Sequence, residues 1–224
     1  MNYIFLTKTM LFRGCTAEEV ESMLQCLGAE SKTFAKGEVI YHAGDAVTAM
    51  GLVLSGSVNI ENDDVWGNKS ILGNVSPGQV FAETYACVPG EPMMVNVVAA
   101  EAAEVLFLHT SRLLQTCPSA CTFHSKLIRN LLTVMAQKNL NLSRRIFHTS
   151  SKSIRGRLLS YLSFEAMQQG SYSFTVPFNR QQLADYLGVD RSALSNELSK
   201  MQREGLLHYE KNTFQLREDS GSLG

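Results

Sequence analysis

The segment from Asn179 to Lys200 constrains this chain most, because it is predicted to form two short helices joined by a tight turn. Apolar residues at helical spacing give each helix a face to bury: Leu183, Ala184 and Leu187 in the first, and Leu194, Leu198 and Met201 in the second. Gly188 is expected to end the first helix, because glycine tolerates a positive φ. Asp190 or Ser192 can cap the second. The segment is therefore predicted to be a helix-turn-helix.

The outer face of the second helix carries short side chains that can form hydrogen bonds, and Glu197 is its only acid. The residues left on that side are Arg191, Ser192, Ser195, Asn196 and Ser199. A helix that reads base edges in a DNA major groove needs such a face. An ordinary helical hairpin with a solvated face is the alternative interpretation.

Charge is distributed unevenly along the 224 residues, although the net charge is only −1. Residues 1–120 hold 6 Lys or Arg against 13 Asp or Glu, whereas residues 121–151 hold 5 against none. The small net charge excludes a globally basic nucleic-acid binder. The asymmetry indicates that only the C-terminal half meets a polyanion.

We expect a cytoplasmic protein without a membrane partner. No apolar run approaches the roughly 20 residues that span a bilayer, and the N-terminus is too short and wrongly flanked for a signal peptide. The five cysteines lack the spacing of a disulfide framework, which fits a reducing compartment.

Three regions follow one another along the chain. After a capped helix at 16–28, residues 31–108 contain short β-rich segments punctuated by glycine, which is typical of an antiparallel barrel or roll. A long amphipathic helix is predicted from Ser111 to about His148, and its narrow apolar stripe can pair with a copy of itself. The stripe consists of Leu127, Ile128, Leu131, Val134, Met135 and Leu142. We therefore divide the chain into domains at 1–110, 111–148 and 149–224.

The last region begins with a polar hinge at 148–153 and a further helix. A short hairpin is predicted at 171–178, before the helix-turn-helix. Two strands around Lys211 and Asn212 are predicted to form a wing after it.

This order of elements resembles the CRP/FNR family of bacterial transcription regulators over nearly the whole chain. The resemblance rests on KGEVIYHAGD (36–45), LVLSGSVNI (52–60) and SPGQVFAE (76–83) in the roll, and on SIRGRLLSYL and NRQQLADYLGVDRSALSNELSKMQREGLL in the C-terminal part. It implies an α+β fold: an N-terminal antiparallel β-roll like the jelly roll of cyclic-nucleotide-binding domains, a long dimerisation helix and a C-terminal winged helix-turn-helix. It also implies a regulator rather than an enzyme. Its expected partners are double-stranded DNA, a second copy of the chain, RNA polymerase and a small-molecule effector.

In that family the second helix enters the major groove, so the resemblance assigns roles to individual residues. Arg191 would reach guanine O6 and N7, Asn196 would pair with an adenine edge, and Ser192 and Ser195 follow the same face. Arg180, Gln181 and Lys200 would contact phosphates. A homodimer would bind a two-fold repeat with half-sites about one helical turn apart.

The expected effector is a small molecule other than cyclic AMP. Cyclic-nucleotide binders of the family carry a Gly-Glu pair and then an Arg-Ser pair about ten residues on. Here Glu83 is present, but Ala82 replaces the glycine and Met93 and Met94 stand where Arg-Ser would be. No Lys or Arg lies between Lys69 and Arg112 to pair with a phosphate. The candidate effector residues are Glu83, Thr84, Tyr85, Met93 and Met94; the open alternative is that the methionines only fill the core.

Other kinds of function remain as alternatives. Cys15 and Cys26 cannot supply the ligands of an iron–sulfur cluster, whereas Cys117, Cys121 and His124 are weak metal candidates at i, i+4 and i+7. A constitutive regulator and a thiol- or metal-responsive one are therefore retained. A cupin-like enzyme would need more histidines than His42 within 31–108, and a signalling adaptor that does not bind DNA is the last alternative.

Overall fold

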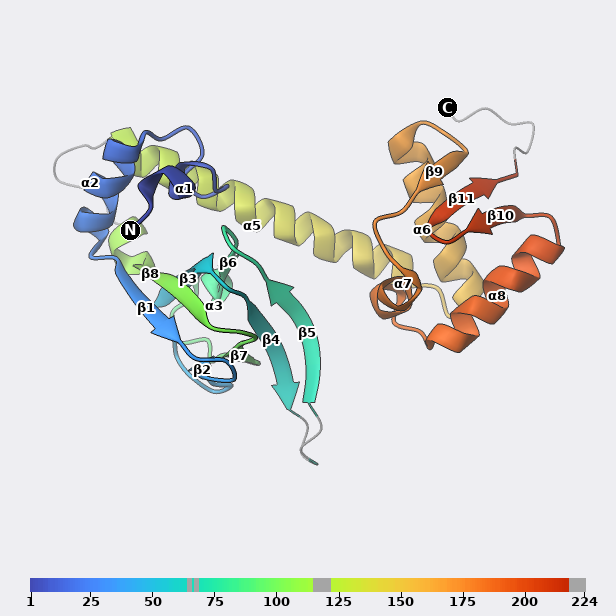
Figure 1. Ribbon diagram of the computed structural model, residues 1–224, viewed down its shortest axis with the longest axis horizontal. Helices are drawn as coiled ribbons and strands as arrows, with labels where there is room; N and C mark the ends of the chain where they lie inside the picture. Colours follow the sequence, from blue (N-terminus) through green and yellow to red (C-terminus); the bar gives the residue numbers. More distant parts are fainter. Residues whose placement is uncertain (64–65, 67–68, 115–121, 218–224) are drawn as a thin grey trace. The chain divides into compact units, whose positions relative to one another are not determined.

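The computed structural model describes residues 1–63, 66, 69–114 and 122–217 (Figure 1). It consists of two compact units, Met1–Gln137 and Lys138–Gly224. The boundary between them falls inside the long helix α5 (Thr122–Thr149). Each unit has its own apolar core.

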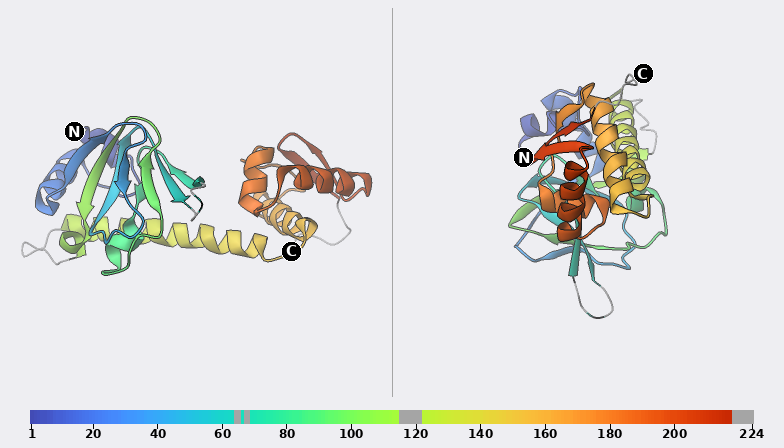
Figure 2. Two further views of the ribbon diagram at one scale, coloured as in Figure 1. Left: turned by 90° about the horizontal axis from the view of Figure 1, so that it is seen from below. Right: turned by 90° about the vertical axis from the view of Figure 1, so that its right-hand side faces the viewer.

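The first unit contains a roll of two antiparallel four-stranded sheets, as the glycine-punctuated segments predicted (Figures 1 and 2). Its strands are β1 (Glu30–Phe34), β2 (Val39–Tyr41), β3 (Ala49–Ser55), β4 (Val58–Asp63), β5 (Lys69–Val75), β6 (Val80–Phe81), β7 (Asn96–Ala99) and β8 (Ala103–His109). One sheet has the order β1-β8-β3-β6 and the other β2-β7-β4-β5.

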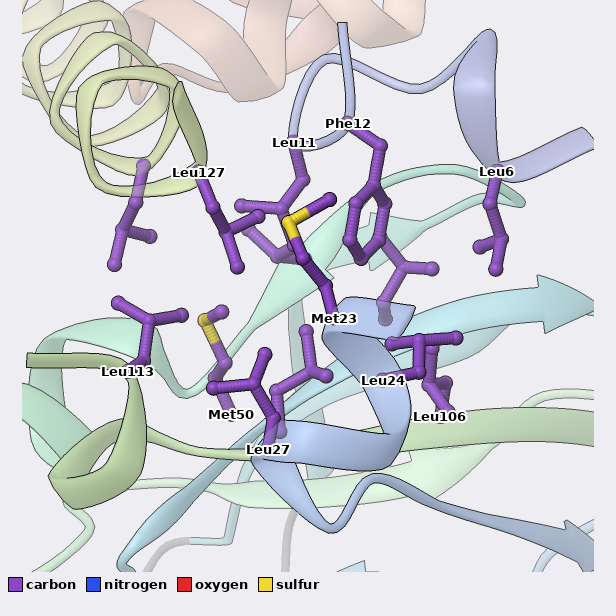
Figure 3. Close-up of a cluster of buried hydrophobic side chains, with 14 of the residues drawn as sticks. Leu6, Leu11, Phe12, Met23, Leu24, Leu27, Met50, Leu106, Leu113 and Leu127 are labelled. Atoms are coloured by element: carbon purple, nitrogen blue, oxygen red, sulfur yellow. The ribbon is translucent and has the colours of Figure 1, made fainter. Parts of the chain in front are cut away.

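Strands β3 and β8 are buried on both faces, which explains their nearly unbroken apolar sequences. Val53 and Val105 point toward the second sheet and belong to the core of the roll. Leu52 and Leu106 point the other way and belong to a second apolar cluster, which the helices of this unit cover (Figure 3).

Short helices cover that outer face. They are α1 (Tyr3–Thr7), α2 (Ala17–Leu27), α3 (Glu83–Cys87) and α4 (Thr110–Leu114), with the start of α5 beside them. The capped helix predicted at 16–28 is confirmed as α2, where Thr16 and Glu19 bond reciprocally in a capping box. The single long helix expected from Ser111 begins as the separate helix α4; residues 115–121 lie outside the described residues.

The second unit is a winged helix-turn-helix. It contains α6 (Ile154–Gln169), β9 (Ser173–Thr175), α7 (Arg180–Leu187), α8 (Arg191–Arg203), β10 (Leu207–Glu210) and β11 (Thr213–Leu216). The predicted wing is confirmed as the β10–β11 hairpin, with Lys211 in the turn at φ +52°. The hairpin expected at 171–178 is wrong: β9 is a single strand that pairs with β11, as Phe174 opposite Phe214 shows.

The polar hinge is shorter than the sequence indicated. Helix α5 continues through Thr149, and α6 begins at Ile154 with Ser153 as its N-cap. His148, expected in the hinge, is instead fully buried on α5. Among the described residues, no helix combines the length and the apolar character that crossing a bilayer requires.

Candidate nucleic-acid interface

Local capping fixes both helices of the helix-turn-helix. Asn179 and Gln182 form a capping box at the start of α7, and Gly188 ends that helix in the left-handed conformation at φ +63°. The Asp190 side chain accepts a hydrogen bond of 2.8 Å from the backbone N–H of Ala193. Of the two caps considered from the sequence, Asp190 is therefore the one that starts α8.

The two helices pack through the apolar faces that the sequence predicted. Leu183, Ala184, Leu187, Leu194, Leu198 and Met201 are each at most 1% exposed. They share one core with residues of α6 and of the wing strands. Because the inner face of α8 is fully used in this way, the direction of its outer face is fixed by packing.

That outer face is polar along its whole length. Ser192, Asn196 and Ser199 are exposed and spaced i, i+4 and i+7, and Arg203 continues the row at i+11. Arg191 is exposed in the first turn and Lys200 beside the row. Ser195 is partly buried, and its hydroxyl donates to the carbonyl of Arg191 over 2.9 Å. Ser199 was expected on this face but was given no role, and Arg203 was missing, although the same spacing extends to both.

The one acid of α8 is neutralised. Arg155 of α6 donates from Nε to Glu197 over 2.6 Å, and its other two nitrogens bind both oxygens of Glu204 at 2.8 and 3.0 Å. The hydrogen bonds from Arg155 are the main reason why the pKa of Glu204 lies below its usual value. Glu197, which looked unfavourable for DNA in the sequence, is thus drawn toward α6 and paired with a cation.

Two residues expected at phosphates have contacts within the protein. The Arg180 guanidinium lies 4.9 Å from the ring centroid of Tyr209 and donates to the carbonyl of Lys211 over 3.3 Å, so it braces the wing. Its burial lowers its pKa. Gln181 is exposed and donates to Asp185 over 2.8 Å.

Two arginines hold the C-terminal end of α7. Arg145, near the end of α5, donates to the carbonyls of Asp185 and Tyr186 at 3.0 and 3.1 Å. Arg157 of α6 donates to those of Leu187 and Gly188 at 2.9 and 3.0 Å. The Arg157 Nε also donates to the carbonyl of Ser151 in the hinge over 2.8 Å.

Close packing at the hinge explains Gly156 in the first turn of α6. A Cβ at this position would clash with the side chain of Ser151, whose hydroxyl would have to turn away. Arg145 and Arg157 were absent from the sequence-based site, because the carbonyls that they hold at the end of α7 lie far from them along the chain.

In the roll, the candidate effector residues surround α3. Ala82 adopts the left-handed conformation at φ +57°, which a glycine would adopt without strain. Glu83 is only 4% exposed, Thr84 is exposed and Tyr85 is partly buried.

The two methionines of this region separate. Met93 is 3% exposed and packs in the core of the roll, whereas Met94 is 72% exposed. The backbone N–H of Met94 donates to the Tyr85 hydroxyl over 3.4 Å. The two therefore do not line one apolar surface together.

The apolar stripe expected on α5 is divided between two environments. Leu127 and Leu131 are at most 2% exposed and belong to the core of their own unit, where Figure 3 shows Leu127 directed from α5 into the cluster. Ile128, Val134 and Met135 are partly buried at the edge of that core. Leu142 is 61% exposed. Leu132 and Ile146, which the predicted stripe did not include, are 63% and 68% exposed.

Two of the three metal candidates fall outside the part of the chain that the structure describes. Cys117 and Cys121 lie outside the described residues, and His124 is 7% exposed. Within the described part of the chain, no group of three potential metal ligands comes together. The pKa values of the Cys15 and Cys87 thiols are raised, mainly because the thiols are buried.

Comparison with known proteins agrees with this architecture. The family model of the cyclic nucleotide-binding domain matches residues 31–119, and that of the Crp-like helix-turn-helix domain matches residues 156–218. The Cyclic AMP receptor protein of Thermus thermophilus is 25% identical over 211 residues, covering 93% of this chain and 92% of that protein. The Transcriptional activator protein FnrA of Stutzerimonas stutzeri is 22% identical over 191 residues, with 83% and 76% covered.

Among solved structures, the c-di-GMP responsive global regulator CLP of Xanthomonas campestris aligns with a TM-score of 0.56 at 19% identity. The alignment covers 91% of this chain and all (100%) of that one. At this identity the likeness establishes the fold alone.

Proposed function

Because the chain belongs to the CRP/FNR family of DNA-binding transcription regulators, which are not enzymes, we propose that it binds a two-fold repeat operator as a homodimer. In this proposal α8 lies in the major groove of each half-site. The outer row of α8 carries the proposal, since Ser192, Asn196 and Ser199 are exposed while the acid Glu197 is paired with Arg155.

Base readout is assigned to the N-terminal half of α8. Arg191 and Asn196 are both exposed. In this proposal Arg191 offers two donors to guanine O6 and N7, and Asn196 pairs with adenine N6 and N7. Ser192 and Ser195 are close enough in sequence to contact neighbouring bases. Lys200, Arg203 and Gln181 are assigned to phosphates, with Arg180 supporting the wing that would meet the backbone beside them.

An apolar row along α5 supports the homodimer. Apolar residues alternate at spacings of four and three residues, with one polar residue, Asn139, at the centre. The row is Ile128, Leu132, Met135, Asn139, Leu142 and Ile146. This is the a/d pattern of a parallel two-stranded coiled coil, over 19 residues or about 27 Å of helix. Leu127 and Leu131 of the predicted stripe are not part of this row, because they are buried in the core of the first unit.

The effector is proposed to be a small molecule other than cyclic AMP. The segment between Lys69 and Arg112 contains no cation to pair with a cyclic phosphate, and the position expected for one is taken by the buried Met93 and the exposed Met94. A phosphate held in the roll without a cation would lose its charge-assisted hydrogen bonds. The raised thiol pKa values of Cys15 and Cys87 disfavour a thiolate switch at those residues.

The readout is tested by selecting operators from random duplex DNA and measuring affinities by fluorescence anisotropy. Arg191→Ala should bind the selected operator about tenfold or more weakly than the wild type, since a bidentate base contact is worth ~1–3 kcal/mol. Its affinity for unrelated DNA should change much less. Arg13→Ala removes an exposed arginine from the first unit and is the matched control. Unchanged affinity and base preference in Arg191→Ala would remove the role assigned to this residue.

The effector proposal is tested by titrating cyclic AMP into the full-length protein in a calorimeter. We expect no saturable heat at millimolar nucleotide. A dissociation constant in the micromolar range would overturn the proposal, whatever the DNA measurements show.

A further inference from the structure

One arginine of α6 holds α8 at two points. Arg155 lies in the first turn of α6, directly after the hinge. Its Nε donates to Glu197, in the middle of α8, over 2.6 Å. Its Nη1 and Nη2 donate to the two oxygens of Glu204, at the C-terminal end of α8, over 2.8 and 3.0 Å. One planar guanidinium therefore uses all three of its nitrogens on a single helix, with a bidentate fork at Glu204.

This contact differs from a solvated surface ion pair. The side chains of Arg155, Glu197 and Glu204 are 33%, 22% and 38% exposed, so all three are partly covered. Single exposed ion pairs contribute little to stability, whereas bidentate pairs and networks of several charges are the exception. The contact therefore constrains the position of α8 and not only its charge.

The wing holds the opposite flank of α8. The side-chain oxygen of Gln202 accepts a hydrogen bond of 3.1 Å from the backbone N–H of Tyr209, and the hydroxyls of Ser199 and Tyr209 lie 3.3 Å apart. Ser199 lies two positions after Glu197, and Gln202 lies two positions before Glu204. Two positions on an α-helix are about 200° apart around its axis. Helix α6 and the wing thus hold α8 from opposite sides.

These polar contacts add a precision that the apolar core of α8 does not supply. Leu194, Leu198 and Met201 decide which face of α8 is buried, but apolar contact is non-directional. Hydrogen bonds between ionised groups are short and directional, so they fix the rotation of the helix about its axis more closely. Base edges are read over hydrogen bonds of about 2.7–3.2 Å, so a small rotation of α8 would misplace Arg191 and Asn196.

We propose that Arg155 is a positioning residue that sets the sequence specificity of α8. The inference rests on the proposed function and adds to it a determinant outside the two helices of the helix-turn-helix. Arg155 acts through Glu197 and Glu204: it fixes the rotation of α8, and so the base edges that Arg191 and Asn196 meet. Because Arg155 stands next to the hinge, a displacement of the first turn of α6 is passed directly to α8.

The test measures specificity as a ratio of two affinities. Operators are selected with the wild type, and fluorescence anisotropy gives the affinity of each variant for the selected operator and for an unrelated duplex of equal length. Arg155→Met removes the guanidinium and should lower this ratio about fivefold or more, the effect of losing one base contact. Arg13→Met, at an exposed arginine of the first unit, is the matched control and should keep the wild-type ratio.

A triple variant separates position from charge. Combining Arg155→Met with Glu197→Gln and Glu204→Gln replaces one positive and two negative charges by none. This variant should bind unrelated DNA at least as tightly as the wild type, because non-specific affinity is electrostatic. Its specificity ratio should nevertheless stay lowered, since no guanidinium holds α8.

Two outcomes would overturn the proposal. A wild-type ratio in Arg155→Met would show that the rotation of α8 does not depend on Arg155, and a restored ratio in the triple variant would show that Arg155 only neutralises the acids. Circular dichroism checks that each variant is folded. If Arg155→Met is not, Arg155→Lys replaces it with the same outcomes, because one ammonium keeps the charge but cannot match both carboxylates. A wild type that selects no operator would instead refute the proposed function, and this inference with it.

Discussion

Replacing Asn139 by leucine should strengthen the dimer substantially. Asn139 occupies the centre of the apolar row on α5, seven residues from Leu132 and seven from Ile146. A single asparagine at such a position fixes the register of a coiled coil but weakens it. The substitution removes that cost and adds apolar surface to both copies.

The magnitude follows from the exposure of the neighbouring positions. Leu132, Leu142 and Ile146 are 61–68% exposed, so each would bury somewhat more than half of its side chain on pairing. Fully burying a leucine contributes ~1.5–3 kcal/mol, which gives ~1.5 kcal/mol per copy and ~3 kcal/mol per dimer. At 1.4 kcal/mol per factor of ten, the dissociation constant should fall about a hundredfold.

Sedimentation velocity over a concentration series measures this change. Asn141→Leu is the matched control, because it makes the same chemical change two residues away and off the row. Equal tightening by both variants would show that general hydrophobicity, and not the row, causes it. A dissociation constant unaffected by Asn139→Leu would refute the proposed pairing.

Two further changes test the two units separately. Burial lowers the pKa of His148, with Arg144 acting in the same direction and Glu165 opposing; the folded state therefore takes up a proton less readily than the unfolded chain. The contribution of neutral His148 to the free energy of unfolding is therefore complete above the usual histidine pKa of about 6.5 and is lost as the pH falls below it. The urea midpoint of the second unit should drop between pH 7.5 and 5.5, and His148→Phe should make this drop smaller. In the roll, Ala82→Gly should stabilise folding by ~0.5–1 kcal/mol, because glycine removes the strain of a left-handed residue at some entropic cost; a lower urea midpoint would contradict this.

The helix-turn-helix could be predicted from the sequence because its signals are local. Asn179 with Gln182, Gly188 and Asp190 each act within four residues, and the structure uses all of them as caps. The same holds for the capping box of α2.

Which apolar residues of α5 are buried in their own unit could not be predicted from the periodicity of the sequence. Leu127 and Leu131 lie next to Ile128 and Leu132 on the helix surface, and which pair is buried depends on the side from which the roll and α2 approach. Likewise, His148 looked like part of a polar hinge because the rings that bury it are far away in the sequence.

The two arginines at the end of α7 also alter the electric field of this helix. An α-helix carries about half a negative charge at its carbonyl end and the same positive charge at its amide end. Arg145 and Arg157 place two positive charges against the carbonyl end. The positive end of the helix, at Asn179 to Gln182, is therefore no longer offset by a negative end. A polyanion near α7 meets a helix whose repulsive end has already been neutralised by the protein.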